Sequence, residues 1–240
     1  MDCVANFTLP SAFGKCIDGT AGPRCEMRCD AGAYNLNAIT LDGCEFLLDG
    51  GAIYVSADDP QASDASGCGR GPVGTIAGAH PCRTIAAGIA EAVAAKRARV
   101  RVADGAYGEP VALASGVSLL GGFRSDTWER HLETTLTTLR GSASLGSHRY
   151  AVIADGISAA TLFEGFQVFG PNNATPGGNS YAIYVKGSGT GLAIGSNQIY
   201  AGTGGPGTTS ASAVGGTNGL DGSGRNTPVT CSAVVKREPG

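Results

Sequence analysis

Short alternations of apolar and polar residues that end on glycine recur along the second half of the chain. They occur at 117–121 (VSLLG), 137–141 (TTLRG), 166–170 (FQVFG) and, with one extra residue, 197–202 (NQIYAG). The closing glycines are roughly 20, 29 and 32 residues apart, which is within the range of stacked structural repeats. The two longer intervals contain loop inserts at 142–149 and 171–180. Without the inserts the unit has about 20 residues, the length of one solenoid turn.

Each of these segments predicts a short β-strand with one inward apolar face. The stretch 99–102 shows the pattern most plainly, because its arginines and valines alternate. A doubly wound fold would need a helix of 10–15 residues after each strand, and no such helical pattern follows residue 97. The pattern therefore predicts an all-β, right-handed parallel β-helix over 98–205, without antiparallel pairing, and leaves a sandwich or a meander as alternatives. Four inward residues are expected to align from turn to turn: Leu119, Leu139, Val168 and Ile199.

The segment 51–97 predicts a cap for the N-terminal end of this solenoid. A strand at 52–56 and a long polar loop at 57–83 precede an Ala-rich stretch, for which Thr84 is a suitable helix N-cap. Ile85, Ile89 and Val93 follow at helical spacing and predict one apolar stripe. Such a helix would cover the first strands and their apolar core; a partner-binding helix is the alternative.

The composition of the chain argues against a nucleic-acid-binding protein and against a membrane-spanning protein. The chain has 240 residues, 39 of them glycine, and 15% are charged, compared with about 25% in an ordinary domain. A net charge of −3 gives no electrostatic footprint for nucleic acid or an anionic membrane, and no apolar run reaches the length of a membrane span. No signal peptide is visible at the start. The residues 206–240 are expected to form a Gly-rich flexible tail.

Eight cysteines indicate an oxidising compartment. Five of them lie in the first 44 residues, so 1–50 is expected to be a small disulfide-stapled segment, with half a zinc site at Cys25 and Cys29 as the alternative. Cys68 and Cys82 bracket a Gly/Pro loop and are expected to form a disulfide, stabilising by about 3 kcal/mol. The pairing of the others stays open: Cys3, Cys16, Cys25, Cys29, Cys44 and Cys231.

An ordered set of segments over 52–205 resembles a known family. AIYVS, PCRTI, VRVADGAYGEPVAL, VSLLGGF and TLFEGFQVFG are similar to segments of secreted bacterial right-handed parallel β-helix proteins of the pectin-lyase-like superfamily, in an uncharacterised Gly-rich subgroup. The resemblance implies a secreted, cell-surface or periplasmic protein. Its better known relatives bind, cleave or demethylate polysaccharides.

The resemblance can be tested on the motifs of those enzymes. Gly105, Tyr107 and Glu109 match the first motif of pectin methylesterases, but the segments that carry the other required residues are missing. We therefore interpret these three residues as structural. The polygalacturonase motifs are also missing, and the candidate acids that remain for a lyase or esterase are Asp155 and Glu164. Ca²⁺ would be needed only for such a lyase, and otherwise no cofactor or metal is expected.

Two functional hypotheses follow. The first is a non-catalytic extracellular or cell-surface scaffold that binds a glycan or a surface partner, and we favour it because every known catalytic set is missing. The second is a polysaccharide-active lyase or esterase that uses Asp155 and Glu164. Neither hypothesis involves nucleic acid or a membrane span, and neither specifies the ligand or the oligomeric state.

Overall fold

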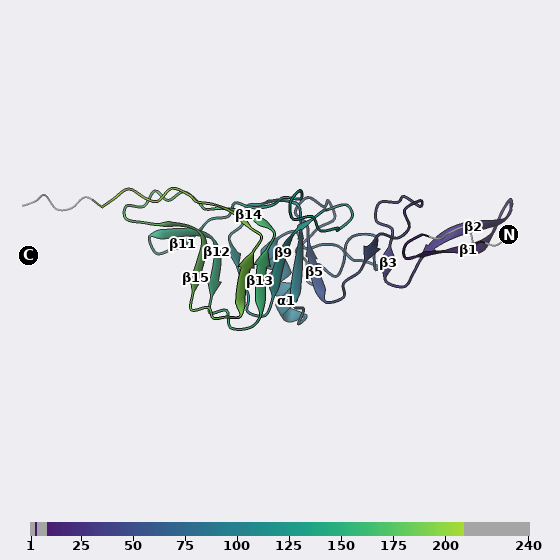
Figure 1. Ribbon diagram of the computed structural model, residues 1–240, viewed down its shortest axis with the longest axis horizontal. Coiled ribbons are helices and arrows are strands. Elements are labelled where there is room, and N and C mark those ends of the chain that lie inside the picture. Colours follow the sequence, from purple (N-terminus) through teal and green to yellow (C-terminus); the bar gives the residue numbers. More distant parts are fainter. Residues whose placement is uncertain (1–2, 4–8, 209–240) are drawn as a thin grey trace, which may run out of the picture. The chain divides into compact units, whose positions relative to one another are not determined.

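Three sheets of parallel strands make up the middle of the chain, and successive segments contribute a strand to each sheet in turn (Figure 1). The structure is a computed structural model and describes residue 3 and residues 9–208. The first sheet contains β5 (Ala52–Val55), β6 (Arg99–Ala103), β9 (Ser118–Phe123), β13 (Thr161–Glu164) and β16 (Leu192–Gly195). The second contains β7 (Gly105–Tyr107), β10 (Thr137–Leu139), β14 (Phe166–Phe169) and β17 (Gln198–Tyr200). The third contains β8 (Val111–Ala112), β12 (His148–Asp155) and β15 (Ser180–Lys186), with β11 (Ala143–Leu145) added to it.

The N-terminal part contributes two antiparallel pairs and the helix. β1 (Ala12–Gly19) pairs with β2 (Gly22–Cys29), and β3 (Ala33–Tyr34) pairs with β4 (Phe46–Leu47). The helix α1 (Ile85–Ala94) packs on β5, β6 and β8. The described residues up to Gly207 form one unit. The predicted flexible tail at 206–240 lies, apart from its first three residues, outside the described residues, as does Cys231.

The prediction of an all-β, right-handed parallel β-helix is wrong. The described strands form five separate sheets rather than one closed solenoid, two of the sheets are antiparallel, and β11 also pairs antiparallel with β12 inside the region expected to be wholly parallel. The reason is local: the insert at 142–149, expected to be a loop, turns back at Gly146 and pairs with the strand that follows it. An alternation that ends on glycine specifies a short strand, but it does not specify closure or partner direction.

The expected alignment of inward residues holds within a sheet but not between sheets. Leu139 is in register with Val168, and Val168 with Ile199, in the second sheet. Leu119 lies in the first sheet, in register with Phe163. Most of these residues are buried, whereas 53% of Ile199 is exposed because it lies on the last described strand of its sheet.

The helix α1 begins where the sequence predicted, and it buries Ile85 and Ile89 of the predicted stripe but not Val93. Thr84 is the N-cap, and its hydroxyl accepts a hydrogen bond from the Ala87 N–H. Val93 is exposed, and the buried face also contains Gly88, where a Cβ would collide with the Val55 side chain. The small residues therefore let the helix backbone approach the first sheet closely.

An aromatic cluster covers the outer side of the first sheet at its N-terminal end. Tyr54 on β5 makes an edge contact with Trp128, with ring centroids 5.0 Å apart, and a similar contact with Phe46 on β4 at 5.9 Å. The Arg101 guanidinium lies over the Tyr54 ring and forms an ion pair with Asp49. The cluster attaches the β3–β4 pair to the parallel sheets through buried apolar contacts.

Candidate functional site

The two candidate acids, Asp155 and Glu164, lie on strands of different sheets. Asp155 ends β12 in the third sheet and is exposed, and its carboxylate forms no hydrogen bond or ion pair with another described residue. Glu164 ends β13 in the first sheet and forms an ion pair with Arg130, with a nitrogen–oxygen distance of 3.1 Å. Arg130 in turn donates to the Gly121 carbonyl, which fixes the pair in place. The fold thus gives these carboxylates separate surroundings and does not assemble them as an acid pair.

The motif residues Gly105, Tyr107 and Glu109 occupy structural positions. Tyr107 is buried; its hydroxyl donates to the Ala103 carbonyl and accepts from the Ala57 N–H. Burial raises the pKa of Tyr107, which keeps its hydroxyl protonated. Gly105 has a φ of 127° and lies beside Asp58, where a Cβ would leave too little room.

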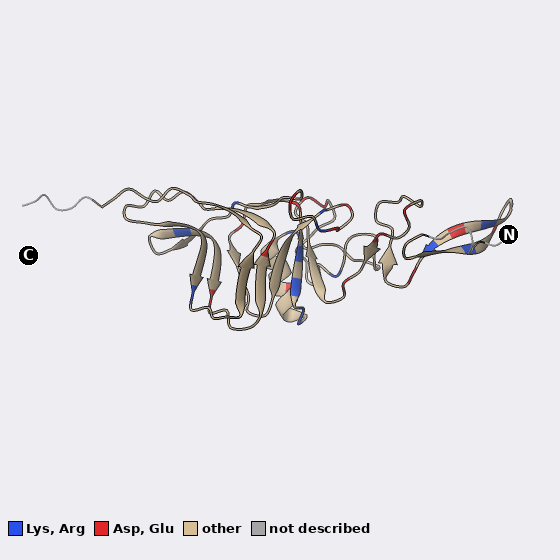
Figure 2. Cartoon of the chain, in the orientation of Figure 1, with Lys and Arg blue, Asp and Glu red and all other residues tan. Residues whose placement is uncertain are grey.

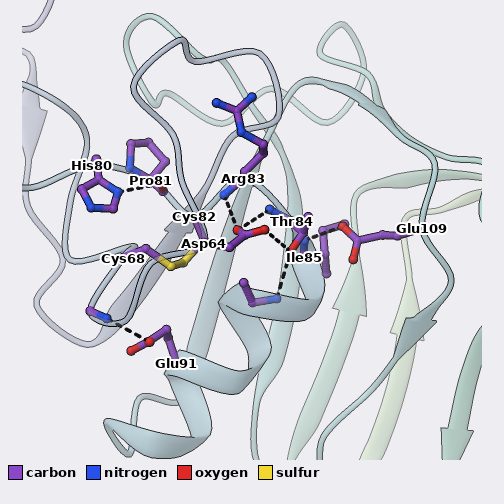
Figure 3. Close-up of a disulfide and its surroundings, with 12 residues drawn as sticks. Asp64, Cys68, His80, Pro81, Cys82, Arg83, Thr84, Ile85, Glu91 and Glu109 are labelled. Carbon is purple, nitrogen blue, oxygen red and sulfur yellow. Dashed lines mark hydrogen bonds between the residues drawn. A yellow bond between two sulfur atoms is a disulfide. The ribbon is translucent and has the colours of Figure 1, made fainter.

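Glu109 holds the N-terminus of the helix (Figure 3). Its two carboxylate oxygens accept from the Ile85 and Ala86 N–H groups at 2.6 and 3.0 Å. These N–H groups have no partner within the helix, and a carboxylate at this end also favours the helix dipole.

A disulfide and two carboxylates that accept from backbone N–H groups hold the loop before α1 in place. Cys68 and Cys82 form a buried disulfide, as Figure 3 shows. The Asp64 carboxylate accepts from the N–H groups of Arg83 and Thr84, and Glu91 accepts from the Gly67 N–H. The carboxylates around the start of α1 therefore bind backbone N–H groups and serve a structural role.

The N-terminal cysteines are also bonded. Cys29 and Cys44 form a disulfide, so Cys29 is not available for the alternative zinc half-site. The sulfur of Cys3 lies within bonding reach of both Cys16 and Cys25, with Cα–Cα distances of 5.9 and 5.3 Å. Since one sulfur forms one disulfide at a time, Cys3 can join the β1–β2 pair through either residue. Disulfides at several places indicate an oxidising environment.

The outer face of the second sheet carries two rows of side chains that cross its strands. Thr138, Gln167 and Gln198 are in register on β10, β14 and β17. The Gln167 amide donates to the Gln198 side-chain oxygen at 3.0 Å. Few Lys, Arg, Asp and Glu residues lie on the strands of the three parallel sheets (Figure 2). This first row is therefore a ladder of neutral hydrogen-bonding groups.

The second row is a stack of planar groups. Phe169 and Tyr200 are in register, with ring centroids 4.6 Å apart and an interplanar angle of 9°. The guanidinium of Arg140, which follows β10, lies 3.7 Å from the centroid of the Phe169 ring. Tyr200 is 44% exposed and lies on the last strand of this sheet among the described residues. The stack therefore ends in a ring that the described residues leave accessible.

A cavity of about 430 Å³ adjoins the amide row. Gln167 and Gln198 line it on one side, and the apolar side chains of Leu132 and Leu136 line it on the other. Both leucines belong to a loop, and their large apolar side chains are partly exposed. The cavity and the two rows together form a surface with planar rings, amide donors and acceptors, and aliphatic contacts.

A second cavity, of about 720 Å³, is lined by Asp58, Asp104 and Asp126, with Arg124 beside them. Two of these three acids, Asp104 and Asp126, are engaged by neighbouring groups. A hydrogen bond from Arg124 lowers the pKa of Asp126 to about 2, and Asp104 accepts from the Ser125 N–H. We therefore take the second-sheet surface as the candidate site.

Comparison with known proteins returned no match: no family model fits the chain, and no curated protein and no solved structure matches it. The sequence did not single out the stacked pair, although it contained a signal for it. Phe169 and Tyr200 occupy the same position, two residues after a glutamine, in the segments FQVFG and NQIYAG.

Proposed function

We propose that the chain is a non-catalytic extracellular binding protein that holds a glycan on the outer face of the second sheet. The observation that carries this proposal is the stack of Arg140, Phe169 and Tyr200, which ends in an accessible aromatic ring beside a ladder of side-chain amides.

The chemistry of a sugar suits both rows. A pyranose ring presents axial C–H groups on its faces, which pack on an aromatic ring, and hydroxyls at its rim, which pair with planar amides. Arg140 restrains Phe169, and Phe169 restrains Tyr200, so the ring loses little conformational freedom when it binds a ligand. Neighbouring side chains within a row are about 4.8 Å apart, and the two rows, two residues apart along each strand, are about 7 Å apart, which lets one chain of sugars contact both rows.

The disulfides support placing this activity outside the reducing cytosol, as a secreted, cell-surface or periplasmic protein. None of the described helices has the length and apolar character needed to cross a membrane. The resemblance to pectin-lyase-like proteins stays a prediction from sequence, because no family model matches the chain.

The alternative enzyme hypothesis requires acids that act on one bond. Asp155 and Glu164 end strands in different sheets, and Glu164 is held by Arg130. This placement does not favour a lyase or an esterase that uses these two acids.

The test is a binding screen of the oxidised full chain on an array of neutral and uronate-containing oligosaccharides, followed by titration of the best ligand. Tyr200→Ala is expected to weaken binding about two- to tenfold, since an aromatic contact contributes about 0.5–1.5 kcal/mol beyond its buried area. Gln198→Ala is expected to weaken it as well, through the lost amide. Tyr184→Ala, which removes a half-buried ring from β15 in the third sheet, is the matched control and should leave the affinity unchanged.

The proposal fails if the wild-type chain retains no oligosaccharide on the array. It also fails if Tyr184→Ala weakens binding as much as Tyr200→Ala, because the ligand would then not be held by the second sheet.

A further inference from the structure

A long hairpin loop joins β3 to β4, and its two ends face each other. Tyr34 pairs with Phe46 in the antiparallel register of these strands. Asn35 and Glu45 follow these paired residues on the two sides of the loop. The Glu45 carboxylate reaches across to the Leu36 and Asn37 N–H groups, which places it next to Asn35 at the neck of the loop.

Two buried oxygen atoms at this neck have no hydrogen-bond partner. They are Asn35 Oδ1 and Glu45 Oε2, and they are the only oxygen atoms of this kind among the described side chains. Both atoms are acceptors, and one belongs to a carboxylate. Leaving such an atom buried without a partner costs about 1–3 kcal/mol, and more when the group is charged. A pair of orphaned acceptors therefore indicates a ligand that attracts oxygen lone pairs.

The rest of the neck is already fixed. Glu45 Oε1 accepts from the Leu36 and Asn37 N–H groups at 2.6 and 3.1 Å, and the Asn35 amide nitrogen donates to the Ile39 carbonyl at 2.9 Å. These bonds use the other polar atom of each side chain and set the direction of the orphaned oxygen. The neck is thus organised before any ligand arrives.

The framework around the loop is rigid. Cys44, next to Glu45, is bonded to Cys29, and Gly43 has a φ of 96° in a place where a Cβ would collide with the Pro10 carbonyl. Leu36 and Tyr34 pack against the aromatic cluster on the first sheet. A site on this loop therefore keeps its geometry without the ligand.

The charge of the loop is negative and uncompensated. Asp42 adds a second carboxylate, which accepts from the Asn37 side-chain amide at 2.9 Å. No lysine or arginine occurs between Arg28 and Arg70. Within the described part of the chain, neither Asp42 nor Glu45 forms an ion pair. A cation would neutralise these carboxylates, whereas a water molecule would not.

We propose that the 35–45 loop binds Ca²⁺ through Asn35 Oδ1 and Glu45 Oε2, with Asp42 supplying further negative charge. An amide oxygen and a carboxylate are hard ligands, which suit Ca²⁺ or Mg²⁺ rather than zinc. Ca²⁺ accepts irregular geometry and completes its shell with backbone carbonyls and water, whereas Mg²⁺ requires a near-ideal octahedron. A site of two fixed ligands at the mouth of a loop fits the more tolerant ion. The proposal does not depend on the glycan function.

Isothermal titration calorimetry tests the site directly, with CaCl₂ added to the oxidised full chain after removal of metal with EDTA. The expected result is saturable binding of one Ca²⁺ with a dissociation constant on the order of 10⁻⁴–10⁻³ M, the range of extracellular calcium modules, and weaker binding of Mg²⁺. Glu45→Gln keeps an oxygen for the two N–H groups and removes the charge, so it should weaken Ca²⁺ binding about tenfold or more.

Asn35→Asp keeps the oxygen, adds a charge and should strengthen Ca²⁺ binding. This gain of affinity cannot come from a damaged fold. Glu129→Gln, at an exposed position far along the chain, is the matched control and should bind as the wild type does. The proposal is overturned if no saturable heat appears up to about 10 mM Ca²⁺, if Mg²⁺ binds more tightly, or if Glu45→Gln and Asn35→Asp bind with wild-type affinity.

Discussion

Replacing Glu109 by alanine removes both acceptors from the first two N–H groups of α1. The carboxylate of Glu109 bonds to the Ile85 N–H at 2.6 Å and to the Ala86 N–H at 3.0 Å. The next N–H, of Ala87, bonds to the Thr84 hydroxyl and is unaffected. Ile85 is fully buried, so its N–H has poor access to water after the change.

The loss can be estimated from these contacts. A hydrogen bond to a charged group contributes about 1.5–3 kcal/mol, and a carboxylate at a helix N-terminus adds about 0.3–1 kcal/mol. The two bonds share one side chain and are not additive, so we expect Glu109→Ala to lower the free energy of unfolding by about 2–4 kcal/mol. Glu109→Gln retains one acceptor and should lose about half as much.

Urea unfolding of the oxidised chain, followed by circular dichroism and Trp128 fluorescence, measures both losses. Glu133→Ala is the matched control, because Glu133 is exposed and makes no hydrogen bond or ion pair within the described part of the chain. It should change the free energy of unfolding by less than about 0.5 kcal/mol. If Glu109→Ala is as mild as this control, the structural role given to the G-x-Y-x-E motif is refuted.

Two further predictions concern the helix contact and the acid dependence of stability. Gly88→Ala should lower the unfolding temperature, because overpacking against Val55 costs about 1–3 kcal/mol and outweighs a gain in helix propensity of about 1 kcal/mol; a higher unfolding temperature would show that the helix is not packed so closely. Burial raises the pKa of Asp49, but a hydrogen bond from Arg99 and the charges of two arginines outweigh it and hold the pKa below its usual 3.8. The stability that this carboxylate contributes is therefore present above pH 3.8 and is lost as the pH falls through the lower, folded-state pKa. Urea midpoints should accordingly fall more steeply below that pH in the wild type than in Asp49→Asn, and parallel pH profiles would contradict this.

The strands could be predicted from sequence to a larger extent than their assembly. Each of the four repeated segments contains a strand, and Thr84 begins the helix, because alternation, glycine and capping are local signals. The insert at 142–149 forms β11 and part of β12 because its pairing depends on a turn at Gly146. The buried face of α1 contains Ile85 and Ile89 of the predicted stripe together with Gly88 and Ala92, and Val93 lies outside this face.

The candidate sites differ in how far the sequence could reveal them. The stack of Phe169 and Tyr200 follows from equivalent positions in two repeats, so a register argument could have found it. The sequence offered Asp155 and Glu164 alike as candidate acids, but it does not show that they end strands in different sheets. The orphaned oxygens at the neck of the 35–45 loop depend on which polar atoms the backbone already occupies, and only the folded chain shows this.

The most direct test of the account follows the side chain of Tyr200 by nuclear magnetic resonance while the best-binding oligosaccharide is added to a chain with labelled tyrosines. Stacking against the exposed ring predicts saturable shifts of the Tyr200 ring protons, with the ring protons of Tyr181 and Tyr184 on β15 unchanged. Saturable binding that shifts the β15 rings and leaves Tyr200 unmoved would contradict the central claim.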